Sequence, residues 1–186
     1  LTHEEHKEVI DIAVEHMRTY PVNKTIAVIA GTGSDSTRKA IEFTKYAATA
    51  GASGVLVVSP YYNKPTQSDL VRHFSEVANS IPHHTPMIVY DILSRCGVVV
   101  EPETRIKILQ GGGNIVGFKE ASGFEHFVKC YDAIEFARSE GKVTQKLGYY
   151  SGDDNITHRI INYTKGNTNC VSGVISVLGN IDPKGC

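Results

Sequence analysis

Short apolar segments and amphipathic segments alternate along the chain, and this alternation limits the fold more than any other feature. Their starts are separated by about 24 to 32 residues, which leaves room for one helix in each interval. Apolar runs typical of β-strands occupy residues 25–30, 54–59, 86–90, 115–119, 146–151 and 170–177. Continuous apolar strands separated by helices are typical of a parallel sheet covered on both faces. The pattern therefore predicts an α/β fold, either a doubly wound open sheet or a (β/α)8 barrel.

Helical periodicity fills the intervals between these strands. The first predicted helix begins with a capping box at Thr2 and Glu5 and continues to Met17. Further helices are predicted over residues 34–50, 67–80, 102–110, 124–138 and 154–164. Six strands in 186 residues are fewer than the eight strands and ~250 residues of a complete barrel. If the fold is a barrel, we expect an incomplete one that forms a single domain over residues 1–186.

The composition excludes several classes of function. A net charge of −1 with eight histidines gives no electrostatic case for binding nucleic acid or an anionic membrane. No apolar stretch approaches the ~20 residues that span a bilayer. The four cysteines form no Cys-x-x-Cys pair, which favours a reduced, cytoplasmic protein without disulfides.

Metal and nucleotide sites are also disfavoured. The histidines His3 and His6 have no further ligands at the usual spacing, and Asp153-Asp154 does not match a calcium loop. The Gly-Thr-Gly of residues 31–33 lacks the third glycine of a dinucleotide fingerprint. We expect neither a metal nor a nucleotide cofactor.

Polar and aromatic residues follow the predicted strands, where a parallel barrel carries its active site. Lys119 ends the strand 115–119, and strict alternation would place Ile115, Gly117 and Lys119 on one face. An inward lysine would have a lowered pKa, with Gly117 making room for it, and its neutral amine could form a Schiff base. The alternative is a lysine that reaches solvent or pairs with Glu120.

Tyr90 and Arg95 follow the strand 86–90. Tyr90 shares a face with Ile88 and could relay protons, or it could be a packed residue whose hydroxyl finds a partner. Arg95 could hold a substrate carboxylate in a bidentate fork, or it could be a solvated loop residue. The pair Tyr61-Tyr62 lies between two prolines, in a stiff loop that could serve an interface or could pack locally.

Taken together, these segments resemble one known family. The motifs occur in the order L-T-H-E-E-H, A-G-T-G-S, P-Y-Y-N-K-P-T-Q, Y-D-I-L-S-R-C-G, G-F-K-E-A-S, S-G-D-D and G-V-I-S-V-L-G-N-I. They resemble the dihydrodipicolinate synthase family, within the pyruvate-dependent class I aldolases that include N-acetylneuraminate lyase. The resemblance implies a (β/α)8 barrel that condenses pyruvate with L-aspartate-4-semialdehyde on the diaminopimelate route to lysine. The alternatives are a sister aldolase acting on a sialic or keto-deoxy sugar acid, and a non-catalytic fragment.

The resemblance also implies roles for individual residues. Lys119 would form the Schiff base with pyruvate, and Tyr90 would relay protons. Tyr62 would reach into a neighbouring subunit's site, which implies a homodimer or homotetramer. Arg95 would guide the semialdehyde carboxylate, and the main chain of Ile175 would contact the pyruvate carboxylate.

This chain departs from the family pattern in three ways. The Gly-Thr-Thr-Gly-Glu loop that precedes the first helix in the family is not in the sequence, and neither are two strands and the C-terminal helical region. We therefore expect barrel strands 3–8, and we predict that the 186-residue chain alone folds poorly or is inactive. The family's Asn-Val-Pro after the tyrosine is Asp91-Ile92-Leu93, and Asp91 would add a negative charge beside the site.

The third departure concerns a lysine-inhibition site that many family members carry. His3, His6 and Tyr61 match that site, whereas Asp35 and Lys39 stand where asparagine and glutamate are usual. A cation in place of an anion should repel lysine, so we expect weak or absent feedback inhibition.

Overall fold

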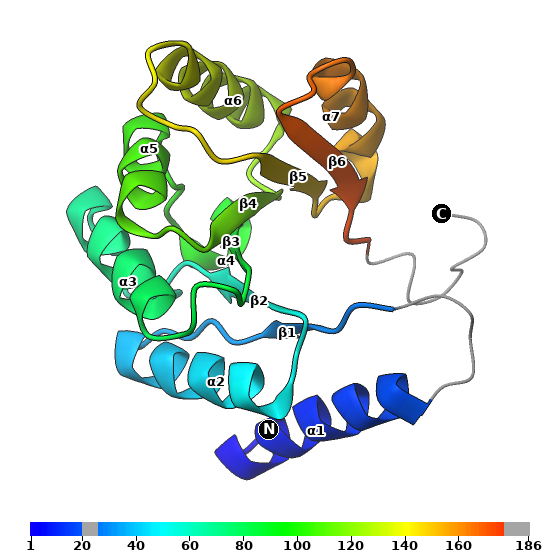
Figure 1. The fold of residues 1–186 in the computed structure, drawn as a ribbon. Helices are drawn as coiled ribbons and strands as arrows, with labels where there is room; N and C mark the ends of the chain where they lie inside the picture. The colour runs from blue at the N-terminus through cyan, green and yellow to red at the C-terminus, as the bar shows by residue number, and fades with distance from the viewer. Residues whose placement is uncertain (20–25, 177–186) are drawn as a thin grey trace.

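The computed structural model describes residues 1–19 and 26–176, and within them six strands form one sheet in chain order (Figure 1). The strands are β1 (Ile29–Gly31), β2 (Gly54–Val58), β3 (Met87–Asp91), β4 (Ile115–Glu120), β5 (Leu147–Ser151) and β6 (Cys170–Val174). Every neighbouring pair is parallel. A doubly wound sheet would reverse its strand order at a switch point, whereas a barrel keeps chain order. The sheet is therefore an incomplete (β/α)8 barrel, as predicted.

Helices cross from each strand to the next and cover the outer face of the sheet in an arc (Figure 1). They are α1 (His3–Thr19), α2 (Thr37–Ala50), α3 (Gln67–Asn79), α4 (Leu93–Cys96), α5 (Pro102–Gly111), α6 (Phe124–Ser139) and α7 (Thr157–Thr164), with a 3-10 turn at Asp154–Ile156. Only α4 was not predicted, because four residues are too few to show helical periodicity.

Local sequence explains where the helices begin and end. The Thr66 hydroxyl accepts a hydrogen bond from the backbone N–H of Asp69, whose carboxylate accepts one from the N–H of Thr66. This capping box starts α3. Gly51 has a left-handed backbone, with φ of 96°, and ends α2 as a glycine in that conformation commonly does.

Two predicted strands differ in length from the observed ones by more than one residue. Residues 26–28 lie before β1 and outside its ladder, so the first strand begins at Ile29 and forms three pairs with β2. The last strand ends at Val174. Residues 175 and 176 are described and lie outside the strand, so the predicted continuation is wrong there. Residues 177–181 of the final motif and Cys186 lie outside the described residues.

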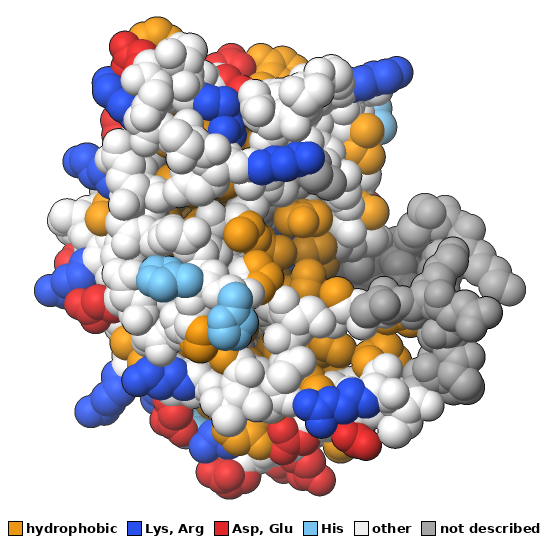
Figure 2. All heavy atoms as spheres, viewed as in Figure 1, with side chains coloured by type: hydrophobic (Ala, Val, Ile, Leu, Met, Phe, Trp, Pro, Cys, Tyr) orange, Lys and Arg blue, Asp and Glu red, His pale blue; other side chains and the backbone are white. Residues whose placement is uncertain are grey.

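The two faces of the sheet carry different side chains. Outward residues such as Val57, Val89 and Phe118 are fully buried against the helices in the main hydrophobic core. Leu56 and Val58 face the inner side, where they line a cavity. Figure 2 shows hydrophobic side chains gathered on this inner side of the arc.

One register shift changes the predicted faces. The ladder pairs Met87 with Ile115 and then Ile88 with Gly117, which leaves Val116 as an extra residue. Ile115 belongs to the helix-packed core, so its predicted place beside Gly117 and Lys119 is wrong. Gly117 and Lys119 keep the predicted face.

Three cysteines lie among the described residues, and all are free thiols: Cys96, Cys130 and Cys170. In the same part of the chain, no helix is both long and apolar enough to cross a membrane.

Candidate active site

Lys119 and Tyr90 are direct partners in the ladder between β4 and β3. Because paired residues of parallel strands point to the same face, both side chains lie on the inner side of the sheet. The Lys119 Nζ is 4.1 Å from the centroid of the Tyr90 ring. The predicted inward orientation of Lys119 is confirmed, and it does not pair with Glu120.

Burial lowers the pKa of Lys119 from its usual value near 10.5. The side chain is half-buried, and the desolvated ammonium is less favourable than the neutral amine. The Tyr90 ring offers a weak cation–π contact but no anion that would restore the charged form. The fraction of neutral, nucleophilic amine near neutral pH is therefore increased.

The glycine that makes room for Lys119 is Gly152, not Gly117. A methyl group added at Gly152 would lie 2.7 Å from Cε of Lys119. A methyl group at Gly117 would instead collide with the carbonyl oxygen of Gly148 on the neighbouring strand. The lack of a side chain at Gly117 thus allows β4 and β5 to pack closely. The prediction that Gly117 makes space for the Lys119 side chain is wrong, because that space lies at Gly152, after β5.

Tyr90 and Arg95 line one cavity of about 430 Å³ at the carboxyl ends of β1 to β3. The other lining residues are Gly31, Gly33, Leu56, Val58, Tyr61 and Ile92. Burial raises the pKa of Tyr90, with a small opposing contribution from the Arg95 charge, so its hydroxyl stays protonated. Tyr90 can therefore donate a proton, and Arg95 supplies an exposed cation in the same cavity.

Ile175 follows β6 at the same end of the sheet. Its backbone N–H donates a hydrogen bond of 2.8 Å to the carbonyl oxygen of Ser151. This N–H would therefore have to give up its bond to Ser151 before it could donate to a substrate carboxylate.

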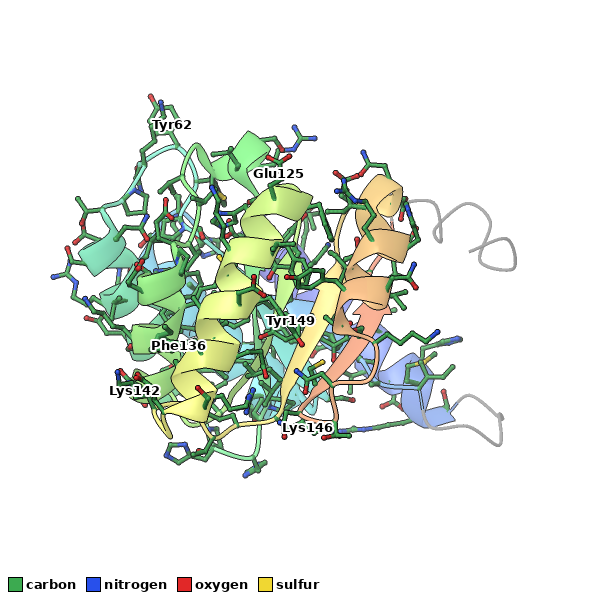
Figure 3. All side chains as sticks on the ribbon, turned by 90° about the horizontal axis from the view of Figure 1, so that it is seen from above. Tyr62, Glu125, Phe136, Lys142, Lys146 and Tyr149 are labelled. Atoms are coloured by element: carbon green, nitrogen blue, oxygen red, sulfur yellow. The ribbon has the colours of Figure 1, made fainter. Side chains whose placement is uncertain are left out.

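The Tyr61-Tyr62 loop projects from the molecule. The Tyr62 side chain is 91% exposed and points outward (Figure 3), and its backbone φ of 70° is rare for a bulky residue. Asn63 fixes the loop, because its side-chain amide donates to the carbonyl oxygen of Asp35 at 2.8 Å. A strained, anchored and exposed tyrosine is available to a partner molecule.

The five residues matched to a lysine site gather around one cavity of about 250 Å³, although they come from three separate segments. They are His3, His6, Asp35, Lys39 and Tyr61. The Nζ of Lys39 lies 3.9 Å from a carboxylate oxygen of Asp35. The substituted pair thus forms its own ion pair at the wall of the cavity.

Sequence reasoning missed a buried charge network behind the site. Arg105 of α5 is fully buried and donates to both carboxylate oxygens of Glu120, to the carboxylate of Asp91 at 2.7 Å and to the carbonyl oxygen of Val100 at 3.0 Å. Asp91 is also fully buried and faces the helices, so the prediction that it adds charge beside the site is wrong. The sequence did contain a sign of this network, since Asp91 and Glu120 end two apolar strands. Carboxylates buried there would require a buried cation.

His126 is the other cation of this network. Its Nε2 lies 3.2 Å from the Asp91 carboxylate. Burial alone would lower the pKa of His126, but its hydrogen bonds with Asp91 and then Cys130 raise it to about 10. Burial likewise opposes the charge of Asp91, yet His126 and Arg105 hold its pKa below the usual value.

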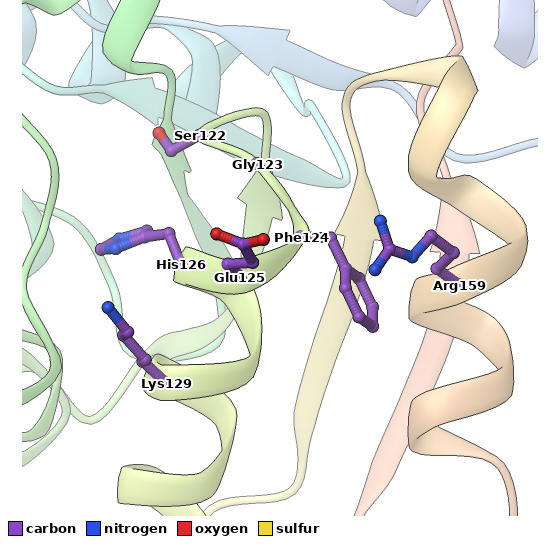
Figure 4. Close-up of a pocket in the computed structure, with 7 residues that line it drawn as sticks. All are labelled: Ser122, Gly123, Phe124, Glu125, His126, Lys129 and Arg159. Atoms are coloured by element: carbon purple, nitrogen blue, oxygen red, sulfur yellow. The ribbon is translucent and has the colours of Figure 1, made fainter.

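The His126 ring also lines a cavity of about 340 Å³ at the N-terminal end of α6 (Figure 4). Lys129 and Glu125 of the same helix border it. Arg159 extends from α7 over the Phe124 ring, with its Cζ 3.9 Å from the ring centroid. His126 therefore connects the buried network to the surface.

No cluster of three or more histidine, cysteine or carboxylate side chains able to hold a metal ion occurs in residues 1–19 and 26–176.

Comparison with known proteins points to one family. The profile of the dihydrodipicolinate synthetase family matches residues 1–185. A 4-hydroxy-tetrahydrodipicolinate synthase of Syntrophus aciditrophicus is 44% identical over 183 residues, which cover 98% of this chain and 55% of that protein. The corresponding protein of Geobacter sulfurreducens is 42% identical, with 99% and 56% covered. The chain thus spans about half the length of the curated relatives it matches.

Solved structures agree in fold. The dihydrodipicolinate synthase of Aquifex aeolicus superimposes with a TM-score of 0.82 at 36% identity, over 98% of this chain and 55% of that one. A structure from Cyanidioschyzon merolae, described as having lysine bound, has a TM-score of 0.79 at 37% identity, over 96% of this chain and 53% of that one.

Proposed function

We propose, from the premise that the chain belongs to the dihydrodipicolinate synthetase family, that it carries the catalytic lysine of a 4-hydroxy-tetrahydrodipicolinate synthase. The reaction would condense pyruvate with L-aspartate-4-semialdehyde on the diaminopimelate route to L-lysine. The observation that carries this proposal is the half-buried amine of Lys119 beside Tyr90, at the carboxyl end of a barrel strand.

The chemistry begins at Lys119. Its neutral amine attacks the keto carbon of pyruvate, which forms a C–N bond and a carbinolamine. Loss of water then gives the imine, which is the Schiff base. Burial supports this step because it lowers the pKa of Lys119 and so increases the neutral fraction.

Tyr90 would move the protons of these steps. Its hydroxyl is protonated at neutral pH, so it can donate to the departing carbinolamine oxygen. Arg95 shares the cavity with Tyr90 and would bind the carboxylate of the aldehyde substrate. The main-chain N–H of Ile175 would contact the pyruvate carboxylate at the end of β6, in exchange for its hydrogen bond to the Ser151 carbonyl oxygen.

The proposal includes no metal or organic cofactor, because the protonated imine itself withdraws electrons from the adjacent carbon. It places the protein in the cytoplasm, where the three free cysteines of the described residues would stay reduced.

The active form would be a homodimer or homotetramer. The exposed Tyr62 side chain supports this assembly, because it extends away from the cavity of its own chain and is free to enter a neighbour's site. One structural relative is described as a monomeric variant, so the assembly needs its own measurement. Sedimentation of the full-length protein and of Tyr62→Ala would show whether this residue stabilises the oligomer.

Borohydride trapping tests the proposal. Full-length protein is treated with pyruvate and sodium borohydride, digested, and mapped by mass spectrometry. We expect one pyruvate-derived adduct on Lys119, none without pyruvate, and none on Lys129, which is exposed on α6. A protein that turns over no pyruvate and carries no adduct on Lys119 would overturn the proposed function.

A further inference from the structure

We propose that Arg105 is a positioning residue that ties the carboxyl ends of β3 and β4 together and so sets the distance between Tyr90 and Lys119. The inference rests on the proposed function for its consequence in catalysis, although its structural part can be measured without substrate.

The two carboxylates that Arg105 binds occupy one rung of the sheet. Asp91 pairs with Glu120 in the ladder between β3 and β4, directly after the pair of Tyr90 and Lys119. Strand side chains alternate, so one rung faces the helices while the preceding rung faces the inner cavity. Arg105 therefore holds the same two backbones that carry the reactive pair, from the opposite side of the sheet.

The guanidinium is suited to this task because it binds both strands at once. One of its nitrogens, Nη2, donates to Asp91 at 2.7 Å and to Glu120 at 3.0 Å, while Nη1 donates to the other Glu120 oxygen. The contact of Nε with the carbonyl oxygen of Val100 at 3.0 Å fixes the plane of the group. A planar fork with several donors restrains angle as well as distance, which a lysine ammonium cannot do.

The network also reaches the loops that follow both strands. The Asp91 carboxylate accepts hydrogen bonds from the Val100 N–H at 3.0 Å and from the Ser122 hydroxyl at 2.9 Å. Ser122 in turn accepts a hydrogen bond from the N–H of Leu93 at 2.9 Å. The start of α4, which carries Arg95, and the segment after Lys119 are thus joined to the Asp91 carboxylate.

The charges of the network balance when His126 is protonated. Two carboxylates, one guanidinium and one imidazolium sum to zero, so the buried cluster needs no further ion. His126 is the member nearest solvent, with 15% of its side chain exposed, and it faces the cavity of Figure 4.

Two variants test the proposal. Arg105→Lys keeps the positive charge but loses the planar set of guanidinium donors. Glu120→Gln keeps the size of the side chain but weakens the hydrogen bonds between β4 and Arg105. The first readout is competitive acylation of Lys119 as a function of pH, with the exposed Lys129 as internal reference. It reports the pKa of Lys119 without pyruvate. The second readout is the rate of borohydride trapping with pyruvate.

The direction of the acylation profile separates positioning from simple electrostatics. If the strand ends loosen, Lys119 becomes more hydrated and its profile moves to higher pH in both variants. Loss of the Glu120 charge alone would move it to lower pH, and Arg105→Lys changes no charge. We expect the shift to higher pH and a trapping rate lowered by at least about tenfold, because small misplacements are costly to a reaction rate.

Glu135→Gln is the matched control. Glu135 pairs with Arg138 at 3.2 Å near the end of α6, at the opposite end of the barrel. This variant should leave the Lys119 profile unchanged. Folded Arg105→Lys and Glu120→Gln proteins with the unaltered Lys119 profile and trapping rate would overturn the proposal. Failure of both to fold would overturn it too, since the network would then serve stability alone. If wild-type Lys119 has a depressed acylation profile but forms no pyruvate adduct, the proposed function fails and the positioning role stands.

Discussion

The Nζ of Lys119 lies 4.1 Å from the ring centroid of Tyr90, and the two residues face each other across one rung of the sheet. The amine and the phenol are thus held by backbone hydrogen bonds rather than by flexible loops. A site built on paired strands fixes its reactive groups more closely than one built on loops alone.

Replacement of Lys119 should remove the covalent chemistry. Lys119→Arg keeps a positive charge, but a guanidinium stays protonated and cannot attack a ketone. We expect loss of the pyruvate adduct and a turnover lower by at least about a thousandfold, measured by trapping and by a coupled assay. Lys129→Arg is the control on α6 and should retain both. Substantial turnover in Lys119→Arg would assign the chemistry to another residue.

Loss of the Tyr90 hydroxyl should slow both imine formation and turnover. Tyr90→Phe keeps the ring beside Lys119 but removes the proton donor. We expect the borohydride adduct to form more slowly, because the departing carbinolamine oxygen loses its proton donor, and steady-state turnover to fall by about a hundredfold, as is typical for loss of a proton-transfer group. A variant with unimpaired turnover would show that Tyr90 only packs.

A methyl group at residue 152 should displace the reactive lysine. Gly152→Ala would place a carbon 2.7 Å from Cε of Lys119, and the flexible lysine would have to move. We expect trapping to slow by about tenfold or more with little change in melting temperature. Gly113→Ala is the matched control, since a methyl group there meets only His83 at 3.8 Å. Equal trapping rates in the two variants would contradict the assignment of room to Gly152.

The buried His73 should make folding stability depend on pH. Burial lowers its pKa to about 4, its Nε2 has no hydrogen-bond partner, and its Nδ1 lies 2.9 Å from the Thr37 hydroxyl. In the unfolded chain it titrates near 6.5, so between pH 6.5 and 4 only the unfolded state gains a proton. The stabilisation is therefore complete above pH 6.5 and is lost as the pH falls toward 4, by on the order of 3 kcal/mol.

Urea unfolding across this pH range tests the effect of His73. His73→Asn should flatten the dependence between pH 6.5 and 4, because the titrating group is gone while a polar atom remains near Thr37. His84→Asn, at an exposed position, should leave the wild-type slope. An equally steep slope in His73→Asn would mean that other groups control acid stability.

Feedback by lysine should be weak. Lys39 lines the cavity that holds His3, His6 and Tyr61, and its ammonium would repel the ammonium groups of lysine. We expect that micromolar free lysine does not half-inhibit the full-length enzyme, and that the Lys39→Glu variant is more sensitive to lysine. Inhibition curves and calorimetry of lysine binding measure both. Micromolar inhibition of the wild-type enzyme would contradict this expectation.

Much of the fold follows from local sequence. Helix and strand order, the parallel sheet and the inward position of Tyr90 and Lys119 were predicted, because periodicity reports which side of an element is buried. The short helix α4 was missed since it has no period to detect. The predicted face of Ile115 was wrong, because the extra residue Val116 interrupts the strand and places Ile115 on the opposite face from Gly117 and Lys119.

The sequence alone determined which residues end the strands, and so which groups could react. The chain order of strands brings those ends to one side of the barrel whatever the details of packing. Tertiary structure alone decided their surroundings: Asp91 turned away from the cavity, Arg105 entered between two carboxylates, and Gly152 rather than Gly117 made room for Lys119. Those contacts join segments far apart in the chain, and their energies depend on desolvation and distance, which no local pattern of residues encodes.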